Sequence, residues 1–198
     1  MWVSETMARQ KEFDRDEVLE KAMNLFWYKG YEATSVQDLV ERMGINRGSL
    51  YDTFGDKHSL YLAVLDRYSK TAAEQLQILE QADAGLPAIE RFFYALETEF
   101  SAGEHCKGCL MANSMVELAL HDPQTARKIA AHLSRMETGF HQVLVRAQKK
   151  GEIATDRDLQ ALARFLTSSV NGLSVMAKAV SDRKVLQDIV KVILSVLK

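Results

Sequence analysis

Residues 44–61, GINRGSLYDTFGDKHSLY, combine side chains that can bind an anion with glycines at positions expected to be helical. Arg47 can donate two hydrogen bonds to a guanine edge or hold a phosphate. Gly48 follows it, and a glycine inside a helix costs about 1 kcal/mol relative to alanine. This cost predicts that another surface, such as the wall of a DNA groove, approaches the backbone closely. The alternative interpretation is an exposed glycine without a role.

Lys57 and Tyr51 add a second set of polar groups to the same stretch. Lys57 lies in the first turn of the next predicted helix, where a cation is unfavourable by about 0.3–1 kcal/mol. A bound phosphate would reverse this effect, because free backbone N–H groups and a lysine both attract an anion. The alternatives are a solvated Lys57 and a Tyr51 that packs in the core beside Phe54.

Short helices must position these residues. Apolar spacing predicts a first helix over 15–29, with Asp14 as its N-cap and Gly30 as its C-cap. Thr34 and Gln37 are spaced as a capping box for the second helix.

The second helix is expected to end at Gly44 in a left-handed conformation. Asn46 then caps a third, short helix, RGSLYDT, whose Leu50 and nearby Phe54 point inward. A short helix, a glycine turn and a second short helix form the helix-turn-helix pattern.

The run TSVQDLVERMGINRGSLYDTFGDKHSLYLAVL resembles the DNA-binding signature of the TetR/AcrR family of bacterial repressors. The shared features are a Thr-capped helix, a glycine turn, a Gly–Ser/Thr–Leu–Tyr core, a Phe, and a Lys that leads into a long helix. The resemblance implies a homodimer that binds a palindromic operator on double-stranded DNA and is released by a small effector. No cofactor, metal site or catalytic residue is expected.

The resemblance also implies which residues touch DNA. Phosphate contacts are expected from Thr34, Ser35, Gln37, Tyr51, Thr53 and Lys57. Contacts to bases or nearby backbone are expected from Arg47, Gly48 and Ser49, and Asn46 belongs to the same set. Thr53 stands where family members commonly have a larger His or Tyr.

Composition limits the other possibilities. The 198 residues are 47% hydrophobic and 26% charged, which is typical of a folded globular protein. Net charge is -2, and residues 1–57 hold eight Lys/Arg against eleven Asp/Glu, so DNA contact must come from a local arrangement. There is no membrane-length apolar run and no signal peptide, which predicts a cytoplasmic protein.

The remainder of the chain predicts an all-α body. We expect about nine helices in total, with a DNA-binding domain over 1–57 and an effector-binding and dimerisation domain over 58–198. The last two helices carry more apolar residues than one buried stripe requires, because Val185 and Val192 widen the second row. They predict either an ordinary core pair or an intersubunit four-helix bundle, and the resemblance favours the bundle.

The effector site is less clearly marked. Aromatic, sulfur-containing and polar residues in the apolar helices are the candidates, although each could equally be core or face water. They are Phe92, Phe93, Leu96, Cys109, Met111, Asn113, Glu117, Phe140, Phe165 and Ser169.

The loop HCKGC supplies an alternative function. Cys106 and Cys109, with His105 beside them, have the spacing of a soft-metal or redox site, which would make the protein a thiol- or metal-responsive regulator. A closed zinc site needs a fourth ligand, and there is no second C-x-x-C. An enzyme in the body is a third possibility, but no motif pairs the histidines with Ser114 or Cys109 as nucleophile.

Overall fold

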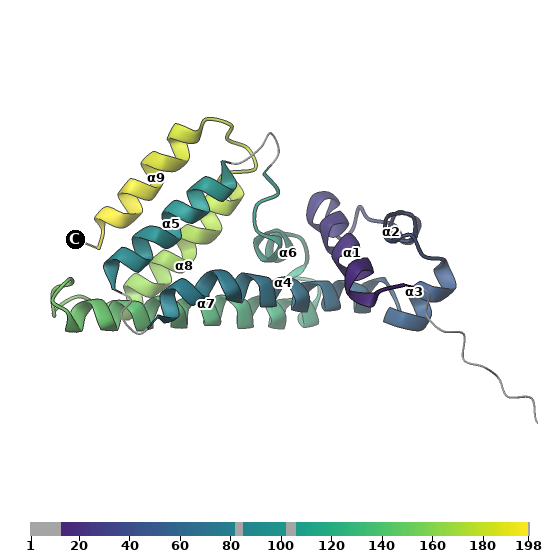
Figure 1. The fold of residues 1–198 in the computed structure, drawn as a ribbon, viewed down its shortest axis with the longest axis horizontal. Helices are drawn as coiled ribbons and strands as arrows, with labels where there is room; N and C mark the ends of the chain where they lie inside the picture. The colour runs from purple at the N-terminus through teal and green to yellow at the C-terminus, as the bar shows by residue number, and fades with distance from the viewer. Residues whose placement is uncertain (1–12, 82–84, 102–105, 198) are drawn as a thin grey trace, which may run out of the picture. The chain divides into compact units, whose positions relative to one another are not determined.

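The computed structural model describes residues 13–81, 85–101 and 106–197, and within these ranges it contains helices and no strands (Figure 1). The predicted all-α class is therefore confirmed. The helices are α1 (Arg15–Lys29), α2 (Val36–Met43), α3 (Arg47–Phe54), α4 (Lys57–Glu80), α5 (Leu86–Phe100), α6 (Leu110–Leu118), α7 (Pro123–Lys149), α8 (Leu159–Met176) and α9 (Arg183–Ser195).

The chain forms two compact units, of which the first ends at Val64 and the second begins at Leu65. The first unit, called the head below, holds α1–α3 and the start of α4. Its core is built from one apolar face of each helix, as the periodicity predicts, and includes Phe26, Leu39, Met43 and Leu50, each at most 1% exposed. Asp14, Gly30 and Gly44 cap their helices as expected.

The cap of α2 differs from the prediction. The N-cap is Ser35, whose hydroxyl accepts from the Asp38 N–H at 3.0 Å while the Asp38 carboxylate accepts from the Ser35 N–H at 2.8 Å. Thr34 and Gln37 are therefore not the capping box. Lys29 of α1 pairs with Asp38 at 2.6 Å, and this contact, with the hydrogen bonds from Ser35, lowers the pKa of Asp38 to about 2. Through the Lys29–Asp38 ion pair, the capping box also connects α2 to α1.

The second unit, called the body below, is a larger helical bundle. One continuous core joins α5, α7, α8 and α9, with Phe93, Phe140, Leu166 and Val190 among its fully buried members. Asp122 caps α7, and Pro123 is its first residue, as predicted. Pro87 is the second residue of α5 and not the first, because the helix begins at Leu86.

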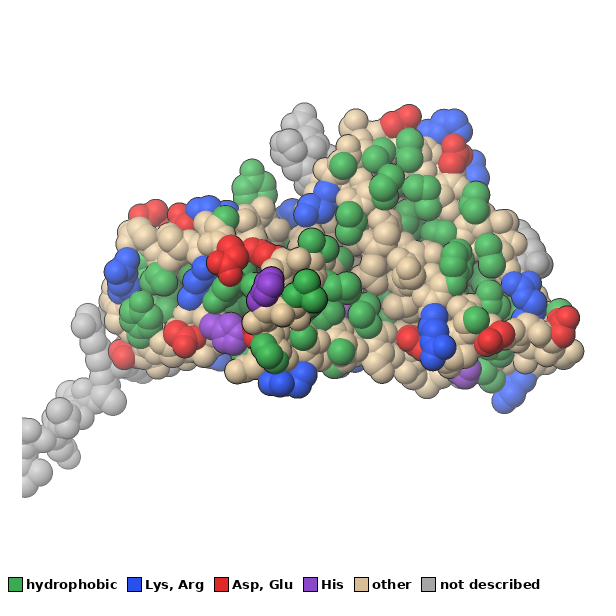
Figure 2. Space-filling view, turned by 180° about the vertical axis from the view of Figure 1, so that it is seen from behind, with side chains coloured by type: hydrophobic (Ala, Val, Ile, Leu, Met, Phe, Trp, Pro, Cys, Tyr) green, Lys and Arg blue, Asp and Glu red, His purple; other side chains and the backbone are tan. Residues whose placement is uncertain are grey.

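An apolar surface remains on α8 and α9 after their inner faces are buried. Figure 2 shows hydrophobic side chains gathered over the part of the body that carries these helices. Val192 is 64% exposed, although Val190 and Ile193 on either side of it are buried. The exposed members are Phe165, Val175, Met176, Val185, Val192 and Val196, called the α8–α9 surface below.

Candidate nucleic-acid interface

The turn between α2 and α3 fixes how α3 is presented. Gly44 adopts φ 71° and ψ 31°, a left-handed conformation that side-chain-bearing residues rarely adopt. Its N–H donates to the Val40 carbonyl at 3.0 Å, and the N–H of Ile45 donates to the same oxygen at 3.2 Å. Asn46 then caps α3 by accepting from the Ser49 N–H at 2.8 Å. Leu50 and Phe54 are buried beneath the helix, so its opposite face is held outward.

The outward face begins with the residues predicted to meet DNA bases. Asn46, Arg47 and Gly48 are exposed at the N-terminal end of α3, and Ser49 is half-buried. This is the end of a recognition helix that reaches base edges. Tyr51, 45% exposed, lies on the next turn, so it is not a core residue.

Gly48 has open space around it apart from its own helix cap. A Cβ at this position would lie 3.3 Å from Oδ1 of Asn46, and the structure records no other atom outside the adjacent backbone within 4 Å. The cap oxygen can yield a few tenths of an ångström. The fold itself therefore tolerates a methyl group here.

Gly48→Ala should therefore separate folding from DNA binding. We expect thermal stability to be unchanged or higher, since alanine gains about 1 kcal/mol of helix propensity. Operator affinity should fall about tenfold or more if a groove wall contacts this backbone. Gly139→Ala in α7, where a Cβ meets only Leu79 at 3.9 Å, is the matched control and should leave operator affinity unchanged. Unchanged affinity of the Gly48 variant would contradict the close approach.

Lys57 is held in a fixed position by an aromatic ring. Its Nζ lies 4.2 Å from the centroid of the Tyr31 ring, a cation–π contact. Tyr31 itself packs against Tyr61 at 4.7 Å between centroids, and Tyr61 against Phe26 at 5.0 Å. The ammonium group is thus anchored to the head's core. Sequence reasoning missed Tyr31, although an aromatic residue directly after the Gly30 cap was a usable signal.

The N-terminus of α4 is capped by an acidic side chain. The Asp56 carboxylate accepts from the Ser59 N–H at 2.6 Å, and this bond lowers the pKa of Asp56. The Asp56 carboxylate therefore already occupies one of the backbone donors at this end of the helix. Phosphate binding at this helix end stays a prediction, with the Lys57 ammonium beside the turn that Asp56 caps.

Lys57→Ala should weaken binding evenly across DNA sequences. Each lost phosphate contact should make the plot of log affinity against log salt less steep by about 0.9, and each protomer loses one contact. Tyr31→Leu should produce a smaller effect of the same kind, because the ammonium is then without its support. Tyr31→Phe keeps the ring and is the control. The measurement is operator affinity over a salt series, and an unchanged slope in Lys57→Ala would exclude a phosphate contact.

Two predicted phosphate contacts are corrected by the structure. Thr34 is fully buried, and its hydroxyl donates to the Gly30 carbonyl at 2.5 Å. The hydroxyl oxygen of Thr53 is also buried and has no hydrogen-bond partner. Neither hydroxyl is presented at the surface of the head. Ser35 and Gln37 are exposed at the start of α2, where Gln37 donates to Glu41 at 2.7 Å, and their contacts with DNA stay predictions.

The predicted effector residues do not form one site in the body. A narrow cavity of about 40 Å³ brings together Phe92, Leu96 and Cys109 from the predicted set. The cavity is also lined by residues outside the predicted set, among them Tyr68, Leu76, His132 and Val170.

The other candidates lie elsewhere. Phe93 and Phe140 are fully buried and stack at 6.0 Å between centroids, so they are core. Phe165 is on the α8–α9 surface, and the Ser169 hydroxyl donates to its carbonyl at 2.8 Å.

The remaining three candidates do not line the cavity either. Met111 lines a separate groove, and Asn113 donates to the Lys107 carbonyl and accepts from Lys178, both at 3.1 Å. Glu117 is half-buried on α6 and does not line the cavity.

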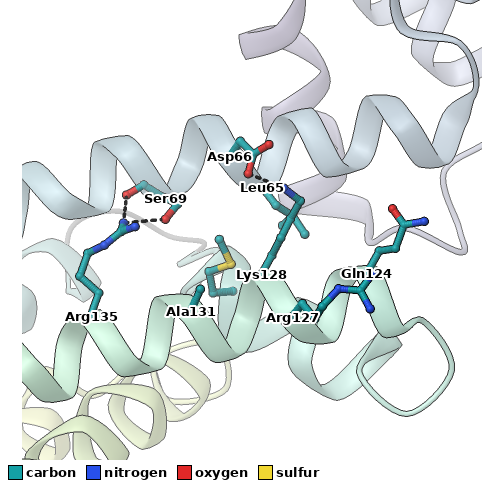
Figure 3. Close-up of a pocket in the computed structure, with 9 residues that line it drawn as sticks. Leu65, Asp66, Ser69, Gln124, Arg127, Lys128, Ala131 and Arg135 are labelled. Atoms are coloured by element: carbon teal, nitrogen blue, oxygen red, sulfur yellow. Dashed lines mark hydrogen bonds and ion pairs between the residues drawn. The ribbon is translucent and has the colours of Figure 1, made fainter.

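The separate groove lies between α4 and α7 within the body and has a volume of about 450 Å³ (Figure 3). Polar contacts bridge it, with Arg135 donating to the Ser69 hydroxyl at 2.9 Å and Lys128 pairing with Asp66 (Figure 3). These contacts connect α7 to α4, the helix that continues into the head. The two helices are thus connected by polar side-chain contacts as well as by packing.

The two cysteines are free thiols in different surroundings. Cys106 accepts from the Gly108 N–H at 3.4 Å, whereas Cys109 accepts from the Tyr68 hydroxyl at 3.3 Å. Among the residues that the structure describes, no group of three or more His, Cys, Asp or Glu is placed to hold a metal ion. His105, the third member of the predicted thiol or metal site, lies outside the described residues.

A helix-turn-helix head joined by a continuous helix to an all-helical body defines a helix-turn-helix DNA-binding protein. Comparison with known proteins agrees, since residues 18–64 match the family of bacterial regulatory proteins named after tetR. Residues 85–193 match the tetracyclin repressor-like C-terminal domain. The chain belongs to the TetR family of bacterial transcriptional regulators.

Individual relatives support this assignment over most of the chain. The HTH-type transcriptional regulator YezE of Bacillus subtilis (strain 168) is 40% identical over 96% of this chain and 100% of its own length. The HTH-type transcriptional repressor ComR of Escherichia coli (strain K12) is 35% identical over 89% of this chain and 85% of its own. These relatives are regulators, and the chain is a DNA-binding regulator and not an enzyme.

A solved relative shows the fold in complex with DNA. The TetR family regulator CifR, as a cysteine mutant with 26-bp double-strand operator DNA, superposes with a TM-score of 0.85. It is 28% identical, and the match covers 96% of this chain and 100% of CifR. The present chain therefore has the same fold as a regulator whose structure was solved with operator DNA bound. No helix in the described ranges is both long and apolar enough to cross a membrane.

Proposed function

We propose that the protein is a cytoplasmic repressor that binds a palindromic operator as a homodimer and leaves it when a small effector binds the body. The observation that carries the proposal is the outward face of α3, where Arg47 and Gly48 lie exposed on a helix fixed by the Asn46 cap. Ser35, Gln37, Tyr51 and the anchored Lys57 supply phosphate contacts that set the register, and the α3 residues set the sequence preference.

The α8–α9 surface supports the dimer. An apolar surface left exposed on neighbouring helices is typical of a protein–protein interface. A two-fold pairing of α8 and α9 from two protomers gives a four-helix bundle, and it presents two heads to successive major grooves. The effector then acts by favouring a body conformation in which the spacing of the heads no longer fits DNA.

The direct test is operator binding by the purified chain. Fragments from directly upstream of its own reading frame, titrated in fluorescence anisotropy, should show saturable binding by a dimer that weakens steeply with salt. Selection from random DNA should yield a palindrome. Absence of salt-dependent affinity for any duplex would reject the proposal.

Val192→Asp should disrupt the dimer. A carboxylate at an apolar interface must be dehydrated without a partner, which costs several kcal/mol. We expect a monomer in sedimentation equilibrium and a loss of operator affinity. Val116→Asp on α6, where the native valine is 83% exposed, is the matched control and should remain dimeric. A dimeric Val192 variant would place the interface elsewhere.

A further inference from the structure

The narrow cavity of the body contains a buried polar group that nothing in the described part of the fold satisfies. His132 of α7 lines the cavity and is 3% exposed, and its Nε2 has no hydrogen-bond partner. Around it, Phe92 and Leu96 of α5 and Met136 of α7 supply apolar walls. Buried polar atoms in native proteins are almost always hydrogen-bonded, so an exception indicates a place completed by a ligand or by water.

We propose that this cavity is the effector site, and that the effector is a small uncharged molecule with an apolar body and one hydroxyl or carbonyl group that hydrogen-bonds to Nε2 of His132. The inference rests on the proposed function, because it specifies the effector that releases the operator.

The charges around the cavity select an uncharged ligand. Burial lowers the pKa of His132 to about 4, and the Arg135 charge adds to this effect, so the imidazole is neutral at physiological pH. Burial also raises the pKa of Tyr68, which therefore keeps its proton and donates to Cys109. Among the described lining residues, the single Asp, Glu, Lys or Arg is Glu99, which accepts from Gln75 at 3.1 Å and is exposed to solvent. A charged ligand would lose its hydration without gaining a buried counter-ion.

The size of the cavity limits the effector. Its volume of about 40 Å³ is well below the roughly 150 Å³ of a cavity that binds benzene. A short alkyl chain with one polar group can enter if the flexible Met136 side chain moves, since methionine adapts readily to a change of shape. A multi-ring drug would require the helices themselves to separate.

Four probes of equal chain length test the inference on the full-length dimer: butan-1-ol, butan-2-one, butyrate and butylammonium. Binding is measured by ligand-observed NMR, without DNA. The alcohol and the ketone should bind saturably, and the two ions at least about tenfold more weakly. His132→Leu should weaken butan-1-ol binding about tenfold, the effect of removing one hydrogen bond. His132→Gln, which can still donate and accept, should restore most of it.

The enlarged variant Met136→Ala gives an independent measurement. It should bind hexan-1-ol more tightly than the wild type does, because the longer chain fills the space that the methionine leaves. Equal affinities in the two proteins would show that the alcohols bind elsewhere and would overturn the proposal.

The outcomes also separate this inference from the proposed function. If the operator binds and neither neutral probe does, or if butylammonium binds as well as butan-1-ol, the effector assignment is wrong and the repressor assignment stands. If the neutral probes bind but leave operator affinity unchanged, the cavity accepts small neutral molecules but is not the effector site. If no operator binds under any condition, the proposed function itself fails.

Discussion

Replacing Arg47 with alanine should reduce operator affinity by about 1–3 kcal/mol per half-site and relax the base preference at one position in each half-site. Arg47 is the first residue of α3 and is exposed, and the Asn46 cap holds the backbone from which it projects. Its guanidinium can donate two parallel hydrogen bonds to one guanine, a geometry that no smaller side chain reproduces.

Two further variants separate base recognition from electrostatic attraction to the DNA phosphates. Arg47→Lys keeps the charge and should retain the salt dependence while losing most of the base preference, because an ammonium lacks the two-pronged geometry. Arg91→Ala, which removes an exposed arginine from α5 of the body, should leave both properties unchanged. The measurement is affinity for the operator and for single-base-pair variants of it. Equal weakening across all these sequences in Arg47→Ala would assign the residue to phosphate and not to a base.

The head could be predicted closely because its signals are local. The α1 range of 15–29, the left-handed Gly44 and the Asn46 cap all depend on residues within a few positions of one another. The cap of α2 was misplaced by one residue because Thr34 and Ser35 both carry a hydroxyl. Burial decides between them, since Thr34 packs inside and donates to Gly30, and burial depends on the whole head.

The effector cavity could not be predicted in the same way. Phe92 and Phe93 are adjacent in sequence and alike in chemistry, yet the first lines the cavity and the second is core. The two side chains point about 100° apart around α5. Which of them faces a cavity depends on where α4 and α7 pack, and the local sequence does not give that position. His132 gave no signal at all, because a histidine within an amphipathic helix has the same appearance whether it faces water or a cavity. Sequence periodicity defines a helix face but not what that face meets.

The buried His132 should make the protein lose stability in mild acid. The unfolded chain binds a proton at this residue near pH 6.5, whereas burial keeps the folded protein from binding it until about pH 4. Between these values the unfolded state holds more protons, so the free energy of unfolding falls as the pH falls. The contribution is fully present above pH 6.5, and about 3 kcal/mol is lost by pH 4.

Other groups with lowered pKa values act outside this range. Asp38, Asp56 and Asp188 all have pKa values lowered from 3.8, so their contributions to stability are present above that value and are lost only in stronger acid. Urea unfolding at fixed protein concentration should therefore show a decrease of about 2 kcal/mol between pH 7 and pH 5 in the wild type. His132→Gln, which cannot titrate, should lose most of that decrease. An equal pH dependence in both proteins would mean that His132 is protonated in the folded state and that its cavity is open to water, which would also remove the basis for an uncharged effector.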